Sequence, residues 1–152
     1  MCALAACSTL EQWNSSPLQV NQVRVLQNCN SDGPQMRASL FADPEAVRVW
    51  QERHQVDLVG VDPLPDAGAY VLVEMGIHTS TGYGLSVSRQ ATVGNGVVQL
   101  QATLFSPPYG ETPPPLVNSP CVLVAFPPGH YRGAEVRDPA GTLLADVTAP
   151  VQ

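Results

Sequence analysis

Proline and glycine interrupt this sequence so often that a turn-rich β structure is favoured over a bundle of helices. The chain has 15 prolines and 12 glycines in 152 residues, and only 13% of its residues are charged. The prolines are densest at 106–120, where the missing backbone N–H groups prevent regular pairing in a sheet. We therefore predict a loop or a polyproline segment there.

Short apolar segments rich in β-branched residues lie between these turn residues and predict strands. Asn95-Gly96 supplies the positive φ angles of a tight type I′ turn, so 93–104 is predicted to be a hairpin. The segment 121–126 is apolar on both faces and is expected to be a central strand. The other predicted strands lie at 19–27, 56–61, 70–77 and 83–91, with a closing hairpin formed by 134–137 and 143–147.

One helix is predicted to begin directly after Asp43. Asp43 is a favourable N-cap, Pro44 fits the first helical position, and Glu45 places an acid in the first turn. The apolar stripe of this helix is narrow, so we expect it to lie against a sheet. The stripe contains Val47, Trp50 and His54.

These elements predict one β-rich domain over 19–152. Its expected fold is mostly β, an antiparallel sandwich or a barrel-like sheet with one flanking α-helix. A chain of this length buries roughly two thirds of its unfolded surface, which is enough for a single core. The formal net charge is -6, and the seven basic residues are all arginine. No basic patch can therefore neutralise a run of phosphates, and a nucleic-acid partner is not expected.

The N-terminal residues 1–7 resemble a shortened bacterial lipoprotein signal. Leu4-Ala5-Ala6-Cys7 fits the lipobox, in which small residues precede a cysteine that receives a lipid. A signal normally has a longer apolar stretch than the six residues before Cys7, so a chance match is the alternative. We expect Cys7 to anchor the chain to the cell envelope, facing the periplasm or the cell exterior, with 8–18 as a tether. No apolar run reaches the ~20 residues of a membrane-spanning helix.

The cysteine count agrees with an exported protein. Cys2 would leave with the signal and Cys7 would carry lipid, so Cys29 and Cys121 would remain. In an oxidising compartment these two cysteines can form a disulfide, and the alternative is two free buried thiols. No CxxC or HxxxH spacing occurs, so neither a metal nor a cofactor is expected.

Catalytic motifs are missing from the sequence, and we predict that this protein is not an enzyme. It has no nucleophile elbow, phosphate-binding loop or zinc-protease motif. His54 is expected at the C-terminus of the helix and His78 at the end of a strand. Asp62, Asp66 and Glu74 are interpreted as turn or edge residues. No small-molecule substrate is expected.

The segment 78–84, HTSTGYG, is the best candidate for partner binding. Two glycines and small hydroxyl residues surround an aromatic side chain between two predicted strands. The proline-rich segment would display a second tyrosine on an extended surface, or would be a simple connector. Tyr83 could instead open the next strand and pack into the core. The candidate binding residues are Thr79, Ser80, Thr81, Gly82, Tyr83 and Tyr109.

Several stretches in series resemble the PrcB family, described as noncatalytic, lipoprotein-type subunits of a bacterial protease complex. The likeness covers about 57–141 and includes TSTGYGLSVSR, QATLFSPPYG and NSPCVLVAFP, preceded by the predicted helix. The resemblance implies that the chain is an accessory subunit of a protease complex, with a protein partner outside the cytoplasm. TSTGY alone is also similar to the NPTTGY loop of chagasin-type inhibitors, which implies the alternative of inhibition by insertion into a protease cleft.

Overall fold

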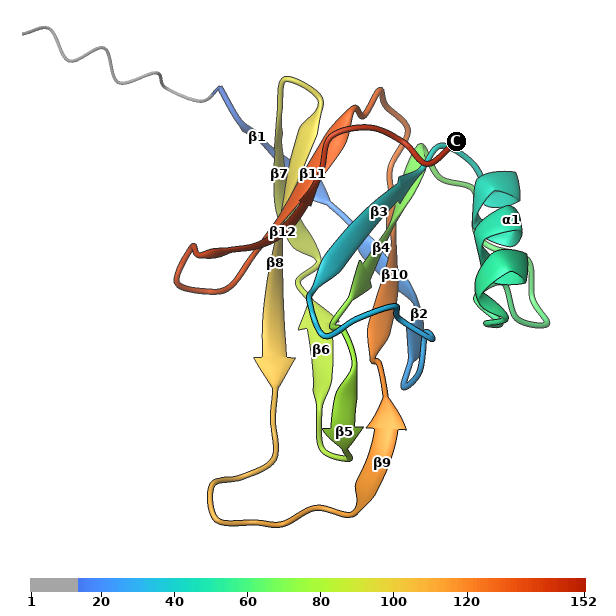
Figure 1. Ribbon diagram of the computed structural model, residues 1–152. Coiled ribbons are helices and arrows are strands. Elements are labelled where there is room, and N and C mark those ends of the chain that lie inside the picture. The colour runs from blue at the N-terminus through green and yellow to red at the C-terminus, as the bar shows by residue number, and fades with distance from the viewer. Residues whose placement is uncertain (1–13) are drawn as a thin grey trace, which may run out of the picture.

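A computed structural model describes residues 14–152 as two packed β-sheets and one helix (Figure 1). The mostly β fold with one flanking helix is confirmed, as an open sandwich and not a closed barrel. Its elements are β1 (Ser16–Gln19), β2 (Asn21–Leu26), β3 (Arg37–Phe41), α1 (Pro44–His54), β4 (Ala69–Glu74), β5 (His78–Ser80), β6 (Gly84–Val87), β7 (Gln90–Gly94), β8 (Val97–Phe105), β9 (Pro115–Asn118), β10 (Cys121–Phe126), β11 (Gly133–Arg137) and β12 (Leu143–Val147).

The first sheet has the order β1-β7-β8-β11-β12, and β6 pairs with the second half of β8. The second sheet has the order β2-β10-β4-β3, and β5 and β9 form a separate pair. All pairs are antiparallel except that of β8 with β11. The chain passes from the first sheet to the second at Val20, whose buried N–H donates to the Arg89 carbonyl.

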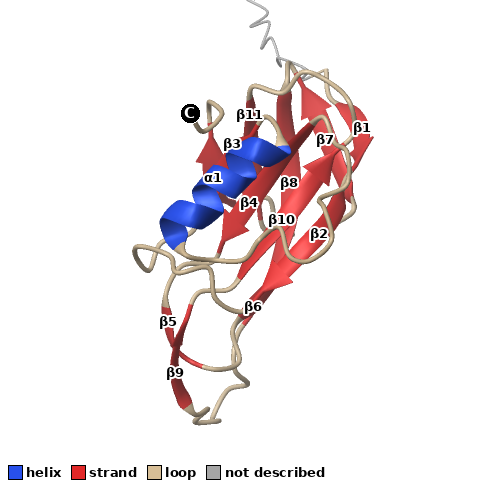
Figure 2. Cartoon of the chain, turned by 90° about the vertical axis from the view of Figure 1, so that its right-hand side faces the viewer, coloured by secondary structure: helices blue, strands red, loops and turns tan. Residues whose placement is uncertain are grey.

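The second sheet is the middle of three layers, which explains why β4 and β10 are buried on both faces. Val71 and Val124 face the core shared with the first sheet. Tyr70 and Leu123 face the opposite core, which is closed by α1. Figure 2 shows α1 lying across this outer face. The predicted central strand at 121–126 is confirmed, because β10 pairs with both β2 and β4.

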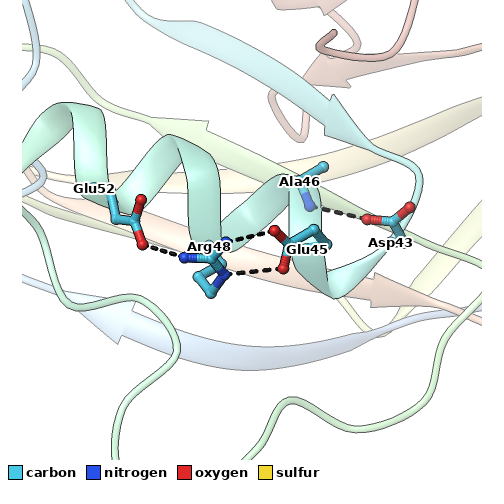
Figure 3. A network of polar contacts seen from close by, with 5 residues as sticks. All are labelled: Asp43, Glu45, Ala46, Arg48 and Glu52. Atoms are coloured by element: carbon cyan, nitrogen blue, oxygen red, sulfur yellow. Dashed lines mark hydrogen bonds and ion pairs between the residues drawn. The ribbon is translucent and has the colours of Figure 1, made fainter.

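The helix begins as its sequence predicts. Asp43 is the N-cap, and its carboxylate accepts a hydrogen bond from the Ala46 N–H at 2.9 Å (Figure 3). Arg48 donates to Glu45 and to Glu52 along the exposed side (Figure 3). The opposite side buries the apolar stripe against the second sheet.

The predicted type I′ hairpin is also confirmed. Asn95 and Gly96 have φ angles of 52° and 76°, and the turn joins β7 to β8 with Gly94 opposite Val97. The closing hairpin of β11 and β12 forms where it was expected. Both turns depend on local residues, so the sequence predicts them.

The predicted strand at 56–61 is wrong, because this segment is an irregular loop. Side chains satisfy its backbone in place of a neighbouring strand. The Gln51 amide oxygen accepts from the N–H groups of Leu58 and Val59, each at 2.8 Å, and Arg24 donates to the Val59 and Asp62 carbonyls. Val56, Leu58 and Val59 of the loop instead cover the core beside α1, and Leu58 is fully buried there.

Three other expectations need correction. The predicted strand 83–91 is divided into β6 and β7, because the chain is interrupted at 88–89. The expected tether 8–18 contributes the start of β1, which begins at Ser16 and pairs with β7. The proline-rich segment is not loop throughout, since Pro115–Asn118 forms β9. The predicted lipidation site, Cys7, lies outside the described residues.

Candidate partner-binding site

The two segments that the sequence singled out lie together at one end of the sandwich. We call residues 78–84 and 103–118 the distal tip, which is the lower end of Figure 1. The Thr81 N–H donates to the Pro114 carbonyl, and the Asn118 side-chain amide donates to the Ser80 carbonyl at 2.7 Å. A Cβ atom on Gly82 would lie 2.9 Å from Pro107, so the glycine permits this close approach. Hydrogen bonds and close packing therefore hold the two segments against each other.

Tyr83 supports the distal tip from inside. Its ring stacks on the His78 ring with a centroid distance of 3.9 Å and an angle of 17° between planes. It is half-buried and packs against the core between the two sheets. Tyr83 therefore packs against the core, as the second interpretation of this residue predicted, and is not an exposed recognition residue.

The other predicted binding residues of 78–84 are divided between the surface and the interior of the tip. Thr79 and Gly82 are exposed, whereas Ser80 and Thr81 are half-buried. The Ser80 hydroxyl donates to the Thr81 carbonyl. This segment thus offers small polar groups at the surface and uses its backbone to hold the proline-rich segment.

Tyr109 is fully exposed at the turn of the proline-rich segment, with a relative exposure of 107%. Four further apolar side chains of the distal tip are exposed, and the sequence did not single them out as binding residues. Their exposure could have been predicted from the sequence, since Phe105 and Leu116 directly adjoin proline-containing stretches that do not build a core. The exposed apolar set is Leu104 at 39%, Phe105 at 51%, Tyr109, Leu116 at 57% and Val117 at 69%.

The distal tip carries almost no charge. Glu111 is the one Asp, Glu, Lys or Arg residue in 78–84 and 103–118. Depletion of charge combined with exposed aromatic and aliphatic side chains is the composition of an interface core. Clusters of exposed apolar residues on soluble domains commonly mark binding surfaces. This arrangement can bury apolar area against a partner without desolvating ions.

A disulfide and a buried polar network lie in the body of the sandwich, directly beyond the end of β9. The structure joins Cys29 to Cys121 in a disulfide, and both cysteines are fully buried. The neighbouring Ser119 hydroxyl accepts from the backbone N–H groups of Cys29 and Ser31 and donates to the Asn28 side chain. Because β9 leads directly into this network, its position is fixed relative to the second sheet.

Glu74 ends β4 inside this region and is only 4% exposed. Burial raises the pKa of its carboxyl group above the ordinary value of 4.5, although the Ser31 hydroxyl donates to it at 2.9 Å and opposes the shift. The folded state therefore binds this proton more tightly than the unfolded state. The stability from this group is fully present below the unfolded pKa and is lost as pH rises through the folded pKa.

We expect Glu74→Gln to become more stable relative to the wild type as pH rises from 4 to 7. The amide keeps an acceptor for Ser31 and has no proton to lose. Urea unfolding of both proteins at pH 4 and pH 7 measures their free energies of unfolding. The difference between the two proteins at each pH excludes the effects of other carboxylates, which both proteins share. A difference that does not change with pH would contradict the expected role of Glu74.

The three histidines lie in separate parts of the structure. His54 stacks on Trp50 with a ring distance of 3.9 Å, and its Nδ1 lies 2.9 Å from the Trp50 carbonyl oxygen. His78 lies at the distal tip and His130 in the loop before β11. The described residues contain no group of three or more His, Cys, Asp or Glu side chains that could hold a metal ion.

Residues 14–152 also contain no helix with the length and apolarity to cross a membrane.

A shallow groove of 1080 Å³ lies on the outer face of the first sheet, away from the distal tip. Its lining combines polar residues, among them Arg89, Gln99 and Gln101, with apolar residues such as Leu18 and Pro139. Arg137 at its edge already donates to Glu135 and to the Gly141 carbonyl.

Comparison with known proteins found no matching family model, no similar curated protein and no similar solved structure.

Proposed function

We propose that this protein is a noncatalytic binding module of the cell envelope that captures a protein partner through its distal tip. The observation that carries the proposal is the distal tip with a single charged residue and five exposed apolar side chains, Leu104, Phe105, Tyr109, Leu116 and Val117. An accessory subunit of a protease complex is the role that the sequence resemblance favours.

The restricted backbone of the distal tip supports this role. Prolines restrict the backbone of 106–115 before any partner arrives, and β9 is held by β5 and by the disulfide region. A surface that is already ordered loses less conformational entropy on association. Tyr109 is then an anchor of large contact area and low side-chain entropy.

We expect Tyr109→Ala to weaken partner binding at least about tenfold, because an aromatic anchor in an interface commonly contributes 2 kcal/mol or more. The partner is first identified by photocrosslinking from position 109 in the native cells, and its affinity is then measured with purified proteins. Val61→Ala is the matched control, since Val61 is 102% exposed but lies in the loop after α1. Equal affinities of the two variants would refute the role of the distal tip.

Attachment to the envelope through a lipid on Cys7 is the second part of the proposal. It accounts for the lipobox-like LAAC. Intact mass of the membrane fraction from bacterial cells, compared between the wild type and Cys7→Ala, tests it. A diacylated species that disappears with Cys7 supports the anchor, and an unmodified soluble wild-type chain overturns it.

Inhibition of a protease is the second candidate function. The observation that favours it is the placement of the turn between β5 and β6 beside the loop 106–114 at one end of a sandwich. Side-by-side loops of this kind can enter an enzyme cleft. Titration of a papain-type cysteine protease with the pure protein tests the candidate. Undiminished turnover at a large excess of the protein rejects inhibition of that class.

A further inference from the structure

The second half of β8 has a strand partner on one side only within the described chain. Its first half, up to Gln101, lies between β7 and the parallel strand β11. Beyond Gln101, Ala102–Phe105 pairs with β6, whereas β11 ends at Arg137 and turns away. Figure 1 shows the lower half of β8 continuing past the turn between β11 and β12. A strand position beside 102–105 is therefore open.

The backbone groups that face this open position can be assigned. The Gln101 carbonyl accepts from the Ser88 N–H at 2.9 Å, so Gln101 directs its backbone toward β6 and β7. Hydrogen-bonding direction alternates along a strand, so Thr103 and Phe105 point the same way as Gln101. Leu104 points to the opposite side, where residues 14–152 supply no strand. Its N–H and C=O are available to an added strand.

Two of the other sheet edges of this fold, those of β3 and β1, are protected, unlike the edge at 102–105. At the edge of β3, the Val151 N–H donates to the Leu40 carbonyl at 2.7 Å. The edge strand β1 contains Pro17, which lacks an N–H donor. Natural proteins also protect open edges with charged side chains. Thr103, Leu104 and Phe105 carry no charge, and Phe105 and Leu104 are exposed.

We propose that Ala102–Phe105 of β8 accepts an extended, uncharged segment of the partner protein as an added strand, in line with β11. This inference rests on the proposed partner-binding function and specifies its mode. The added strand bonds to Leu104. Leu104 and Phe105 face opposite sides of the sheet, so apolar side chains on one face of the added strand pack on Leu104 and those on the other face pack on Phe105. A basic or acidic segment would place its charges on a surface that offers no opposite charge except Glu111.

The test uses the whole protein and an uncharged hexapeptide of alternating threonine and valine as the probe. We expect the peptide to slow amide hydrogen exchange of Leu104 about tenfold at about ten times its Kd. A fully N-methylated peptide of the same sequence is the matched control, because it cannot donate strand hydrogen bonds. The Thr103 amide, already directed toward β6, and the Val61 amide in the loop after α1 are internal references.

Protection of Leu104 by the plain peptide and not by the methylated peptide supports strand addition. Equal protection by both peptides, or by neither, overturns it. If protection of Leu104 instead grows with protein concentration when no peptide is present, the edge pairs with a second copy of this chain. That result also overturns the proposal. These outcomes are separate from the crosslinking test, since side-chain capture at Tyr109 can hold while backbone pairing at Leu104 fails.

Discussion

Cys29→Ala/Cys121→Ala is expected to lower the free energy of unfolding by about 4 to 5 kcal/mol. The disulfide closes a loop with a sequence separation of 92 residues. In the chain-entropy description, opening a loop of this length returns that much conformational freedom to the unfolded state. Urea unfolding of the oxidised wild type and the double variant measures the loss directly. A loss of this size is a large part of the stability of a domain this small.

The single variants provide the control. Either Cys29→Ala or Cys121→Ala breaks the bridge, so the first substitution should carry nearly the whole loss and the second should add little. The wild type in reducing agent should lose a similar amount. Two single losses that add up to the double loss would show that each cysteine contributes through packing alone, and would contradict the role of the bridge.

Trp50→Ala is expected to cost about 3 to 5 kcal/mol, the range for truncating a large buried aromatic side chain. Trp50 is 7% exposed and lies between α1 and the second sheet. Its ring meets Phe41 edge to face at 6.4 Å and stacks on His54 at 3.9 Å. A helix of 11 residues has little stability of its own, so loss of this contact should free it from the sheet.

Glu52→Ala on the exposed side of the same helix is the control, and we expect it to change the free energy of unfolding little. Urea unfolding measures both variants, and hydrogen exchange of the α1 amides reports whether the helix opens independently. Faster exchange of these amides in Trp50→Ala alone is the expected result. Similar unfolding curves for Trp50→Ala and Glu52→Ala would contradict a stabilising role for the helix contact.

The disulfide variant and Trp50→Ala are also expected to differ in their effect on the distal tip. The disulfide lies where β9 enters the body of the sandwich, whereas Trp50 lies under α1 on the outer face of the second sheet. Loss of the disulfide should therefore loosen the distal tip more than loss of Trp50 does. Comparing hydrogen exchange of the β5 and β9 amides in the two variants tests this coupling.

The sequence by itself determined the features that depend on neighbouring residues. Asp43 and Pro44 set the start of α1 through capping and a fixed φ angle. Asn95 and Gly96 accept positive φ angles and set the turn between β7 and β8. The continuous apolar run at 121–126 required burial on both faces, and β10 has it. The predominance of β structure follows from the same local preferences.

The tertiary structure alone decided which segments pair as strands and which surfaces remain exposed. The apolar segment 56–61 has strand composition, but Gln51 and Arg24 satisfy its backbone, so it remains a loop. Pro115–Asn118 becomes a strand because β5 lies beside it. Tyr83 is half-buried whereas Tyr109 is exposed, although both adjoin glycine. Burial and strand pairing depend on residues far away in the sequence, and local preferences therefore cannot determine them.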